Sequence, residues 1–465
     1  MFKIPLSLNS RVFFYAKKSI KGFTFAEIKN AAKNMNVLLL GSGGRESAFA
    51  WKIAQSNLCK QLFIAPGNGG TQQYGKNIDL NIHDFSALKD FCIQHEITIL
   101  LPGGEDTLVE GIYDFFKSDP DLKHIIVVGP SQEGAQLEGS KAFAKKFMQR
   151  HQIPTAAYQE FNINNYEAGL QYLENHSLPI VLKADGLAAG KGVVITSDVE
   201  EAKSVFTSMI KEAAFGSAGD KVVVEAFLTG VELSVFAFSD GENYVLLPEA
   251  KDYKRIGEGE TGLNTGGMGA VSPVPFAKGA FMEKVIRQIV EPTVQGLKSE
   301  KITYTGFIFF GLINVNGDPF VIEYNCRMGD PETEVVIPRL ENDLVDLFQK
   351  MEHKALHEVK LQFKKEAAAT VMLVSAGYPG SYEKGKKIGG LNNTNNSIIF
   401  QAGTKIKDTE TITNGGRVLA ITSFGDDLEN ALETSFQNAE KIHFEGKNYR
   451  KDIGFEFLGN KIKAK

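Results

Sequence analysis

Residues 180–196 read IVLKADGLAAGKGVVIT, in which a glycine-rich segment separates two apolar runs. The spacing of a Walker A loop is absent, because Lys191 is followed by Gly192 and Val193. A glycine hairpin between two strands can fold over phosphates and offer them backbone N–H groups together with Lys191. Lys183, on the first strand, would point a second cation at the same phosphates. Taken alone, the stretch also fits a surface hairpin with two solvated lysines.

A second informative stretch, PFVIEYNCRMGDPETE, covers residues 319–334. Glu323 and Asn325 are two residues apart on a β-patterned segment, so both side chains are predicted to lie on one face of a sheet. A carboxylate and an amide oxygen suit Mg²⁺, which binds few protein oxygens together with phosphates. Arg327 follows in a loop, where its planar fork could hold a carboxylate or a phosphate. The apolar stretch GFIFFGLINVNG (306–317) is expected to be the buried hairpin partner, which disfavours a simple surface strand.

Two segments between these stretches complete a predicted nucleotide cleft. KVVVEAFLTGVELSVFAF (221–238) places Glu225 at the end of a buried strand and Glu232 after a turn. Residues 225–228 are suitably spaced for the adenine edge and Glu232 for the ribose hydroxyls. KDYKRIGEGETGLNTGGMGAVSP (251–273) shows no core pattern, and a long loop of this kind is usually functional. We expect a lid or substrate cradle there, with disorder as the alternative.

The N-terminal part alternates strands and helices. Apolar runs at 36–41, 61–67, 97–104 and 125–130 are separated by segments that include helical patterns at 46–56 and 85–96, which predicts a parallel sheet. Ligands of such sheets bind outside the carboxyl ends of the strands, here at GSGGRE (41–46), PGN (66–68) and GGED (103–106). Glu46 stands where a dinucleotide fingerprint has its third glycine, so a nicotinamide cofactor is disfavoured. Two interpretations of GSGGRE stay open: a cradle that binds a single phosphate, or a tight turn that binds no ligand.

Composition favours a multi-domain cytoplasmic enzyme. The chain has 465 residues, 43% hydrophobic and 23% charged, and its three cysteines are too few for a disulfide framework. No apolar run reaches membrane-spanning length, and a net charge of −5 argues against a nucleic-acid partner. Residues 1–34 differ from the rest, with seven basic side chains against one acid. We expect this extension to be disordered or to precede a natural start at Met35, with a targeting segment as the alternative.

Seven strings along the chain, GSGGRE, PGN, LEGSKAFAK, VLKADGLAAGKGV, NTGGMGA, YTGF and VIEYNCRMGDPET, together resemble the phosphoribosylamine–glycine ligase (glycinamide ribonucleotide synthetase) family of ATP-grasp enzymes. The resemblance runs from about Met35 to the C-terminus. It implies an α/β and α+β multidomain fold: a Rossmann-like N-terminal domain at 35–135, a two-lobed ATP-grasp domain at 136–360 with its small lobe at about 160–228, and a small, mostly β C-terminal domain at 367–465. It also implies purine biosynthesis, in which ATP drives the joining of glycine to 5-phosphoribosylamine.

The resemblance assigns roles to individual residues. It implies that ATP is bound by the two lysines, the 185–192 loop, the hinge and the ribose acid, namely Lys141, Lys183, Asp185, Gly186, Gly190, Lys191, Gly192, Glu225, Ala226, Phe227, Leu228 and Glu232. It implies that Mg²⁺ or Mn²⁺ is bound by Glu323 and Asn325. From the chemistry of the reaction, we expect Arg327, Asp252 and Lys254 to act in catalysis. The phosphoribosylamine site is expected at Gly43, Gly44, Arg45, Glu46, Gly67, Asn68, Glu105, Asn264, Thr265, Gly266, Gly267, Met268, Gly329 and Asp330. We expect small-molecule partners only, and a monomer or weak homo-oligomer.

Three positions depart from the family pattern. Ala226 replaces the second of two hinge glutamates, Gly104 replaces a proline before Glu105, and Glu334 replaces a glutamine. Ala226 should affect nucleotide binding little, since hinge contacts are largely main-chain. Gly104 is expected to affect the shape of a loop, and Glu334 one polar contact. Another ATP-grasp carboxylate–amine ligase is the alternative function, because it would share Lys183, Glu323 and Asn325.

Overall fold

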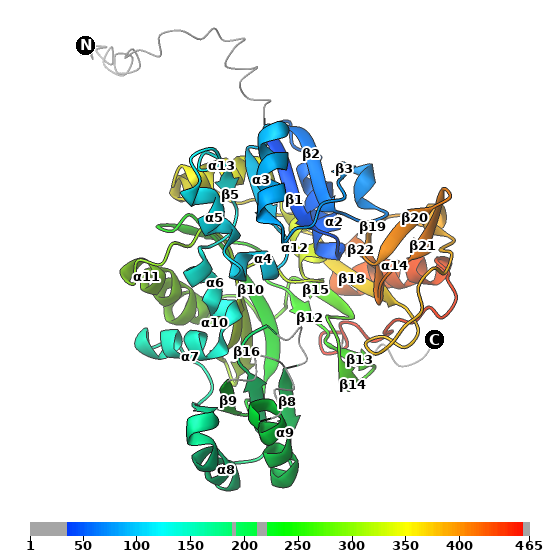
Figure 1. The fold of residues 1–465 in the computed structure, drawn as a ribbon. Coiled ribbons are helices and arrows are strands. Elements are labelled where there is room, and N and C mark those ends of the chain that lie inside the picture. Colours follow the sequence, from blue (N-terminus) through cyan, green and yellow to red (C-terminus); the bar gives the residue numbers. More distant parts are fainter. Residues whose placement is uncertain (1–34, 188–191, 212–220, 459–465) are drawn as a thin grey trace, which may run out of the picture.

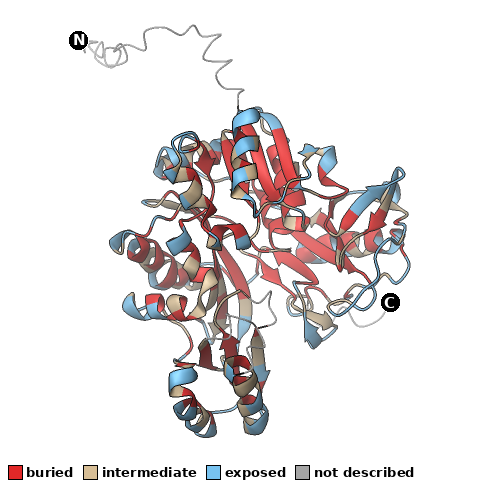
Figure 2. Cartoon of the chain, in the orientation of Figure 1, coloured by how far each residue is buried: buried red, intermediate tan, exposed pale blue. Residues whose placement is uncertain are grey.

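The computed structural model describes residues 35–187, 192–211 and 221–458 (Figure 1). Gly190 and Lys191 of the predicted phosphate loop lie outside the described residues, as does the 1–34 extension. Buried residues gather along the central sheets, and exposed residues cover the outer faces of the helices (Figure 2). None of the helices in these ranges has the length and apolar character needed to cross a bilayer.

The N-terminal region is a parallel five-stranded sheet in the order β3-β2-β1-β4-β5. The apolar runs that predicted its strands form β1 and β4, which are buried at almost every residue because helices cover the sheet. Its strands are β1 (Met35–Gly41), β2 (Cys59–Pro66), β3 (Lys76–Asn77), β4 (Ile99–Pro102) and β5 (Ile126–Val127), and its helices are α2 (Gly44–Ile53), α3 (Phe85–Gln94), α4 (Asp106–Val109) and α5 (Ile112–Ser118).

A small antiparallel lobe projects from the rest of the molecule at the bottom of Figure 1. Its sheet has the order β6-β9-β7-β8, and two helices close a separate core around Phe161, Phe206 and Leu182. The elements are β6 (Tyr158–Asn162), α8 (Tyr166–Glu174), β7 (Ile180–Ala184), β8 (Val193–Thr196), α9 (Val199–Lys211) and β9 (Lys221–Ala226). The pairing of β7 with β8 confirms the strand–loop–strand prediction for 180–196.

The large lobe is built on an antiparallel sheet in the order β11-β10-β16-β17. The predicted hairpin is present, with residues 309–315 of β16 paired to β17 and a register shift at Gly311/Leu312. The strands are β10 (Val231–Ser239), β11 (Tyr244–Leu246), β16 (Gly306–Val315) and β17 (Asp318–Asn325). The helices of this region are α6 (Gln132–Gly139), α7 (Lys141–Arg150), α10 (Ala280–Val285), a π-helix (Ile286–Val290), α11 (Glu291–Ser299), α12 (Thr333–Arg339) and α13 (Leu344–Glu352).

The C-terminal region contributes a third large sheet, in the order β12-β15-β18-β22-β19, covered by α14 (Leu428–Lys441). Its strands are β12 (Lys251–Asp252), β15 (Gly269–Ser272), β18 (Ala367–Val374), β19 (Ser397–Gln401) and β22 (Arg417–Gly425). Two hairpins flank it: β13 (Arg255–Gly257) with β14 (Thr261–Asn264), and β20 (Thr404–Lys407) with β21 (Glu410–Thr413). Short 3₁₀ turns occur at Thr71–Gln73, Ile163–Asn165, Leu356–Glu358 and Leu391–Asn393.

The segment 251–273 differs from the expected open loop. It forms four short strands, of which β12 and β15 belong to the C-terminal sheet. Tyr253 and Met268 are fully buried in the core beneath that sheet. The absence of a core pattern was misleading because strands of two to four residues are too short for a sequence period, and glycines stand between the apolar residues.

Candidate active site

Two adjoining cavities separate the small lobe from the large lobe. Their volumes are about 390 and 530 Å³, and both are lined by Lys183, Glu225, Asp252, Lys254 and Glu323. The first cavity extends toward the N-terminal and C-terminal regions, and the second runs along the segment that links the lobes. The shared lining makes them parts of one cleft.

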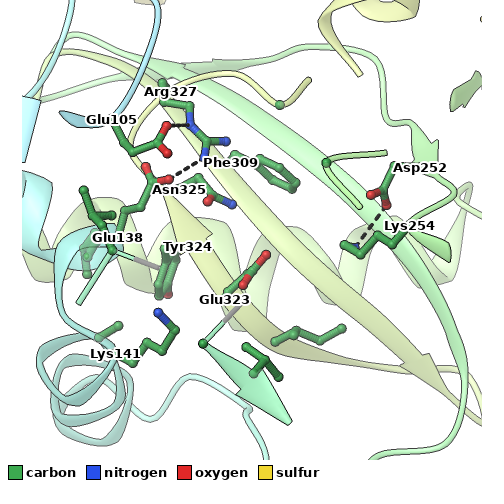
Figure 3. Close-up of a pocket in the computed structure, with 18 of the residues that line it drawn as sticks. Glu105, Glu138, Lys141, Asp252, Lys254, Phe309, Glu323, Tyr324, Asn325 and Arg327 are labelled. Carbon is green, nitrogen blue, oxygen red and sulfur yellow. Dashed lines mark hydrogen bonds and ion pairs between the residues drawn. The ribbon is translucent and has the colours of Figure 1, made fainter. Parts of the chain in front are cut away.

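Glu323 and Asn325 lie at the end of β17 and both line the first cavity, as Figure 3 shows. The intervening Tyr324 is buried, and its hydroxyl lies 2.8 Å from the Thr293 hydroxyl. Gly311 on β16 leaves room for the acid, since an added Cβ would lie 3.1 Å from Glu323 Cγ. Glu323 and Asn325 therefore line the same cavity, and the intervening Tyr324 also contributes to its lining.

The two side chains fit a hard divalent ion. They supply one carboxylate and one amide oxygen, the ligand types that Mg²⁺ prefers. Across the described residues, no group of three or more His, Cys, Asp or Glu side chains gathers as a metal site. An ion held by Glu323 and Asn325 would therefore complete its coordination with oxygens of a bound phosphate or water.

Glu225, Lys145 and Lys183 form a buried cluster of charged side chains on the wall of the cleft. Glu225 Oε1 lies 3.0 Å from Lys183 Nζ, and Glu225 Oε2 lies 3.0 Å from Lys145 Nζ. Lys145 also donates to Thr155 Oγ1 at 2.7 Å, and Lys183 donates to the Ile322 carbonyl at 3.1 Å. Burial lowers the pKa of Lys145 to about 8, although Glu225 opposes this shift. Burial acts to raise the pKa of Glu225, but the two lysines outweigh it and leave that pKa lowered.

Lys141 begins helix α7 and lines the first cavity. Its ammonium donates to the Gly186 carbonyl at 3.0 Å, and burial lowers its pKa. Asp185 accepts from Ser140 Oγ and from the Ala142 backbone N–H, both at 3.0 Å, so it anchors the start of α7. Asp185 and Gly186 therefore contact the start of α7, and the described residues of the 185–192 segment that line the first cavity are Leu187 and Gly192.

The predicted hinge borders the second cavity, which is lined by Glu225, Ala226, Phe227, Leu228 and Glu232. The partly exposed Phe227 offers an apolar surface to a flat base. Glu232 Oε2 lies 3.0 Å from Lys254 Nζ, which lowers the pKa of that carboxyl. Lys254 also lies 3.2 Å from Asp252, which places three charged groups at the junction of the two cavities.

Arg327 links three regions of the chain. Its Nε lies 3.0 Å from Glu105 Oε2 and its Nη2 lies 2.5 Å from Glu138 Oε1, as Figure 3 shows. Glu138 also accepts from the Cys326 backbone N–H at 2.8 Å. Burial raises the pKa of Glu138 to about 7, with Arg327 opposing it. Burial also acts to raise the pKa of Glu105, but Arg327 and Arg45 lower it to about 2.

Carboxylates of the protein itself lie against the N-terminus of α2. Gly43 N donates to Glu46 Oε2 at 2.6 Å, and Arg45 N lies 3.4 Å from Asp330 Oδ2. Glu334 is fully buried beside Gly44, where an added Cβ would lie 2.2 Å from its Oε1. Arg45 is the one residue of the GSGGRE string that lines the first cavity.

Several residues that were predicted to bind substrate make contacts within the fold instead of lining the cleft. Asn68 is buried and bonds to Ser42, Ser47 and Gln401, and Gly67 precedes it at the same junction. Neither lines either cavity, and Met268 is a core residue. The cleft is lined instead by Glu105, Asn264, Thr265, Gly266, Gly329 and Asp330. Gly267 packs against Pro331 behind that lining.

Four charged residues that line the first cavity were not identified from the sequence: Glu138, Lys145, Glu332 and Arg417. Lys145 follows Lys141 by four residues, a spacing that puts both on one face of a helix and could have been recognised. Glu332 belongs to the DPETE turn, and Glu138 precedes the SKAFAK string. The place of Arg417 at the cleft could not be predicted from the sequence, because it depends on how the third sheet packs against the cleft.

Comparisons with known proteins agree with this arrangement. Three domains of one family match: the phosphoribosylglycinamide synthetase N domain at residues 35–138, its ATP-grasp (A) domain at 139–333, and its C domain at 368–456. The chain is 42% identical over 424 residues to a phosphoribosylamine–glycine ligase of Fusobacterium nucleatum, covering 90% of this chain and 98% of that protein. It is 44% identical over 429 residues to the corresponding ligase of Vibrio cholerae, covering 91% and 99%.

Solved structures give the same result. A phosphoribosylamine–glycine ligase from Thermotoga maritima superposes with a TM-score of 0.77 at 35% identity, covering 90% of this chain and 100% of that one. A biotin carboxylase from Campylobacter jejuni shares the fold with a TM-score of 0.67 at 15% identity, covering 92% and 95%. The resemblance and the multidomain fold class expected from the sequence are thereby confirmed. The chain belongs to the phosphoribosylglycinamide synthetase family, whose members are ATP-dependent ligases.

Proposed function

We propose that the cleft joins glycine to 5-phosphoribosylamine through a glycyl phosphate intermediate, releasing ADP and phosphate. The ligation is the reaction of the family, and the site residues and the intermediate are our assignment. The observation that carries the assignment is the meeting of Glu323 and Asn325 with Lys141 and Lys183 in one cavity. Hard oxygen ligands and ammonium groups are the two requirements of a bound triphosphate.

The chemistry explains why a phosphoryl group is needed. A carboxylate resists attack by an amine because its oxygen is a poor leaving group. Transfer of the γ-phosphoryl group breaks the bond between the β–γ bridging oxygen and phosphorus and forms an acyl phosphate on glycine. The amine of phosphoribosylamine then attacks the carbonyl carbon, and inorganic phosphate leaves. The protein contributes positioning and charge neutralisation for both steps.

Each side of the cleft has its own task in this proposal. Lys141 and Lys183 hold the ATP phosphates, residues 225–228 hold adenine, and Glu232 holds the ribose. Glu323 and Asn325 would bind Mg²⁺ or Mn²⁺, which would neutralise charge on the phosphates. Arg327, fixed by Glu105 and Glu138, would orient the glycine carboxylate or the transferring phosphoryl group.

Closure over the intermediate follows from its chemistry. Glycyl phosphate hydrolyses in water, so the reacting atoms must be shielded. Thr265 and Gly266 line the first cavity from the C-terminal side, and Leu187 and Gly192 line it from the small lobe. We also propose the domain division 35–135, 136–360 and 367–465, with a small lobe at about 160–228, and a monomer or weak homo-oligomer in the cytoplasm.

The test is Glu323→Ala compared with Asp318→Ala. Both acids lie on β17, but Asp318 is exposed at the other end of the strand, where it pairs with Lys284 at 2.6 Å. We expect E323A to lose at least ~100-fold in glycine-dependent ADP release, the scale of a lost electrostatic contact in a transition state. D318A should stay within about twofold of the wild type in the same assay. Near-normal turnover by a folded E323A protein would remove the assignment.

A further inference from the structure

Arg417 reaches the catalytic cavity from the C-terminal region. It is the first residue of β22, in a sheet whose only other strand to line the cleft is β12 (Figure 1). Its side chain is 20% exposed and lines the first cavity. It does not line the second cavity, where the predicted adenine and ribose residues lie. Arg417 therefore serves the end of the cleft away from the nucleoside.

One nitrogen of Arg417 holds two loops of the site together. Its Nη1 donates to the Gly266 carbonyl at 2.6 Å and to the Asp330 carbonyl at 2.7 Å, and lies 2.9 Å from Asp330 Oδ1. The absence of a side chain at Gly266 permits this approach, since an added Cβ would lie 3.0 Å from Arg417 Cζ. From the same region, Tyr378 accepts from the Gly266 N–H at 2.9 Å.

The rest of the Arg417 guanidinium is available. Among the described residues, no hydrogen bond joins its Nε or Nη2 to the protein. Arg45 offers a second cation in the same cavity, from the N-terminal region. Its Nε donates to Glu46 at 2.7 Å and its Nη1 donates to the Met328 carbonyl at 3.2 Å. Its Nη2 is therefore the nitrogen that can donate to a ligand. Asp330 contacts both residues, through the Arg45 backbone and the Arg417 side chain.

We propose that Arg417, together with Arg45, binds the 5′-phosphate of the sugar substrate and of the product. This inference rests on the proposed function and adds a subsite to it. A guanidinium offers paired N–H donors that match a phosphate monoester, and Arg417 is already oriented by its three Nη1 contacts. Lys183 lies on β7 of the small lobe and Lys141 at the start of α7, and ATP is expected at these two lysines. A phosphate at Arg417 leaves the amine end of the sugar free to extend toward Glu323 and Asn325.

The experiment measures the affinity of two ligands for two variants of Arg417. Glycinamide ribonucleotide and its dephosphorylated riboside are titrated calorimetrically into wild type, Arg417→Gln and Arg417→Lys. Lys407→Gln, an exposed change on β20, is the control. We expect R417Q to weaken ribonucleotide binding at least tenfold and riboside binding less than twofold. R417K should lie between R417Q and wild type, and K407Q should equal wild type.

Steady-state kinetics separate this subsite from a merely structural clamp. With freshly made phosphoribosylamine, R417Q should raise the KM for that substrate at least tenfold while the KM values for ATP and glycine change less than twofold. If all three KM values rise together, or if both ligands weaken equally, the phosphate assignment is overturned. If wild type itself shows no ADP release dependent on glycine and phosphoribosylamine, the proposed function fails instead, a result visible before any variant is made.

Discussion

Replacing Glu225 by glutamine should destabilise the small lobe and weaken ATP binding. Glu225 is 3% exposed, and each of its oxygens lies 3.0 Å from a buried ammonium, that of Lys183 or of Lys145. Breaking a buried ion pair by removing one partner costs about 3–5 kcal/mol. Glutamine keeps one oxygen as an acceptor, so we expect the small lobe to lose about 3 kcal/mol of stability, the lower end of that range.

The pH dependence of this loss has a defined sign. The pKa of Lys145 is already lowered to about 8, against an ordinary value of 10.5, and removing Glu225 lowers it further. Between the folded and unfolded pKa values the unfolded chain binds more protons, so stability rises with pH there. The cost of Glu225→Gln should therefore be larger at pH 6 than at pH 9. The double variant Lys145→Met/Glu225→Gln should recover at least ~1 kcal/mol, because one unpaired cation is gone.

Native-state hydrogen exchange of the β7 and β9 amides measures this loss locally, which matters because a chain with several cores does not unfold in one step. Glu160→Gln is the matched control: Glu160 lies on neighbouring β6 and pairs at 2.7 Å with Lys146, whose side chain is half exposed. Such a pair should contribute less than about 1 kcal/mol. The reasoning is refuted if Glu225→Gln and Glu160→Gln have equal effects, or if the double variant is less stable than Glu225→Gln alone.

Two further predictions concern the cleft. Burial, and next the charge of Asp252, raise the pKa of Glu332 to about 7, so its contribution to stability is present at low pH and is lost as pH rises toward 7. Glu332→Gln should therefore gain about 2 kcal/mol relative to wild type between pH 5 and pH 8 in denaturation experiments, and a constant difference would contradict this. Gly267 has φ +114° and an added Cβ would lie 2.4 Å from Pro331 Cδ, so Gly267→Ala should lower kcat/KM at least tenfold and cost about 1–3 kcal/mol. Gly259→Ala, with φ +64° but open space around it, should lose less activity, and equal losses would argue against the clash.

Much of the site could be predicted because its residues are local in sequence. The period of two along β17 is enough to place Glu323 and Asn325 on one face, and the apolar run of β16 identifies its partner strand. The same reasoning placed Glu225 at the end of a buried strand. It did not reveal that two lysines share this acid, because the contact joins α7 to β7 and β9, and no local pattern encodes that packing.

The N-terminal loops show a different kind of limit. GSGGRE has the glycines of an anion cradle, and the helix it predicts is present as α2. Whether the free N–H groups meet a ligand depends on nearby side chains, and Glu46 occupies the N–H of Gly43. The third-glycine argument correctly separated this loop from a dinucleotide fingerprint, but it could not show that the replacing residue binds back to its own helix end. A glutamate three residues after the N-cap is the sequence signal for such a contact.

The strands β12 and β15 explain why the C-terminal region contributes to the candidate site. Both come from the segment that carries Asp252 and Gly266, yet β15 completes its sheet only by pairing with β18, more than ninety residues away in the chain. The positions of Asp252, Lys254 and the 264–267 loop are therefore set by a sheet whose other strands are C-terminal. Arg417 and Tyr378 then fix the same loop through its backbone. The C-terminal region therefore determines where this loop meets the cleft.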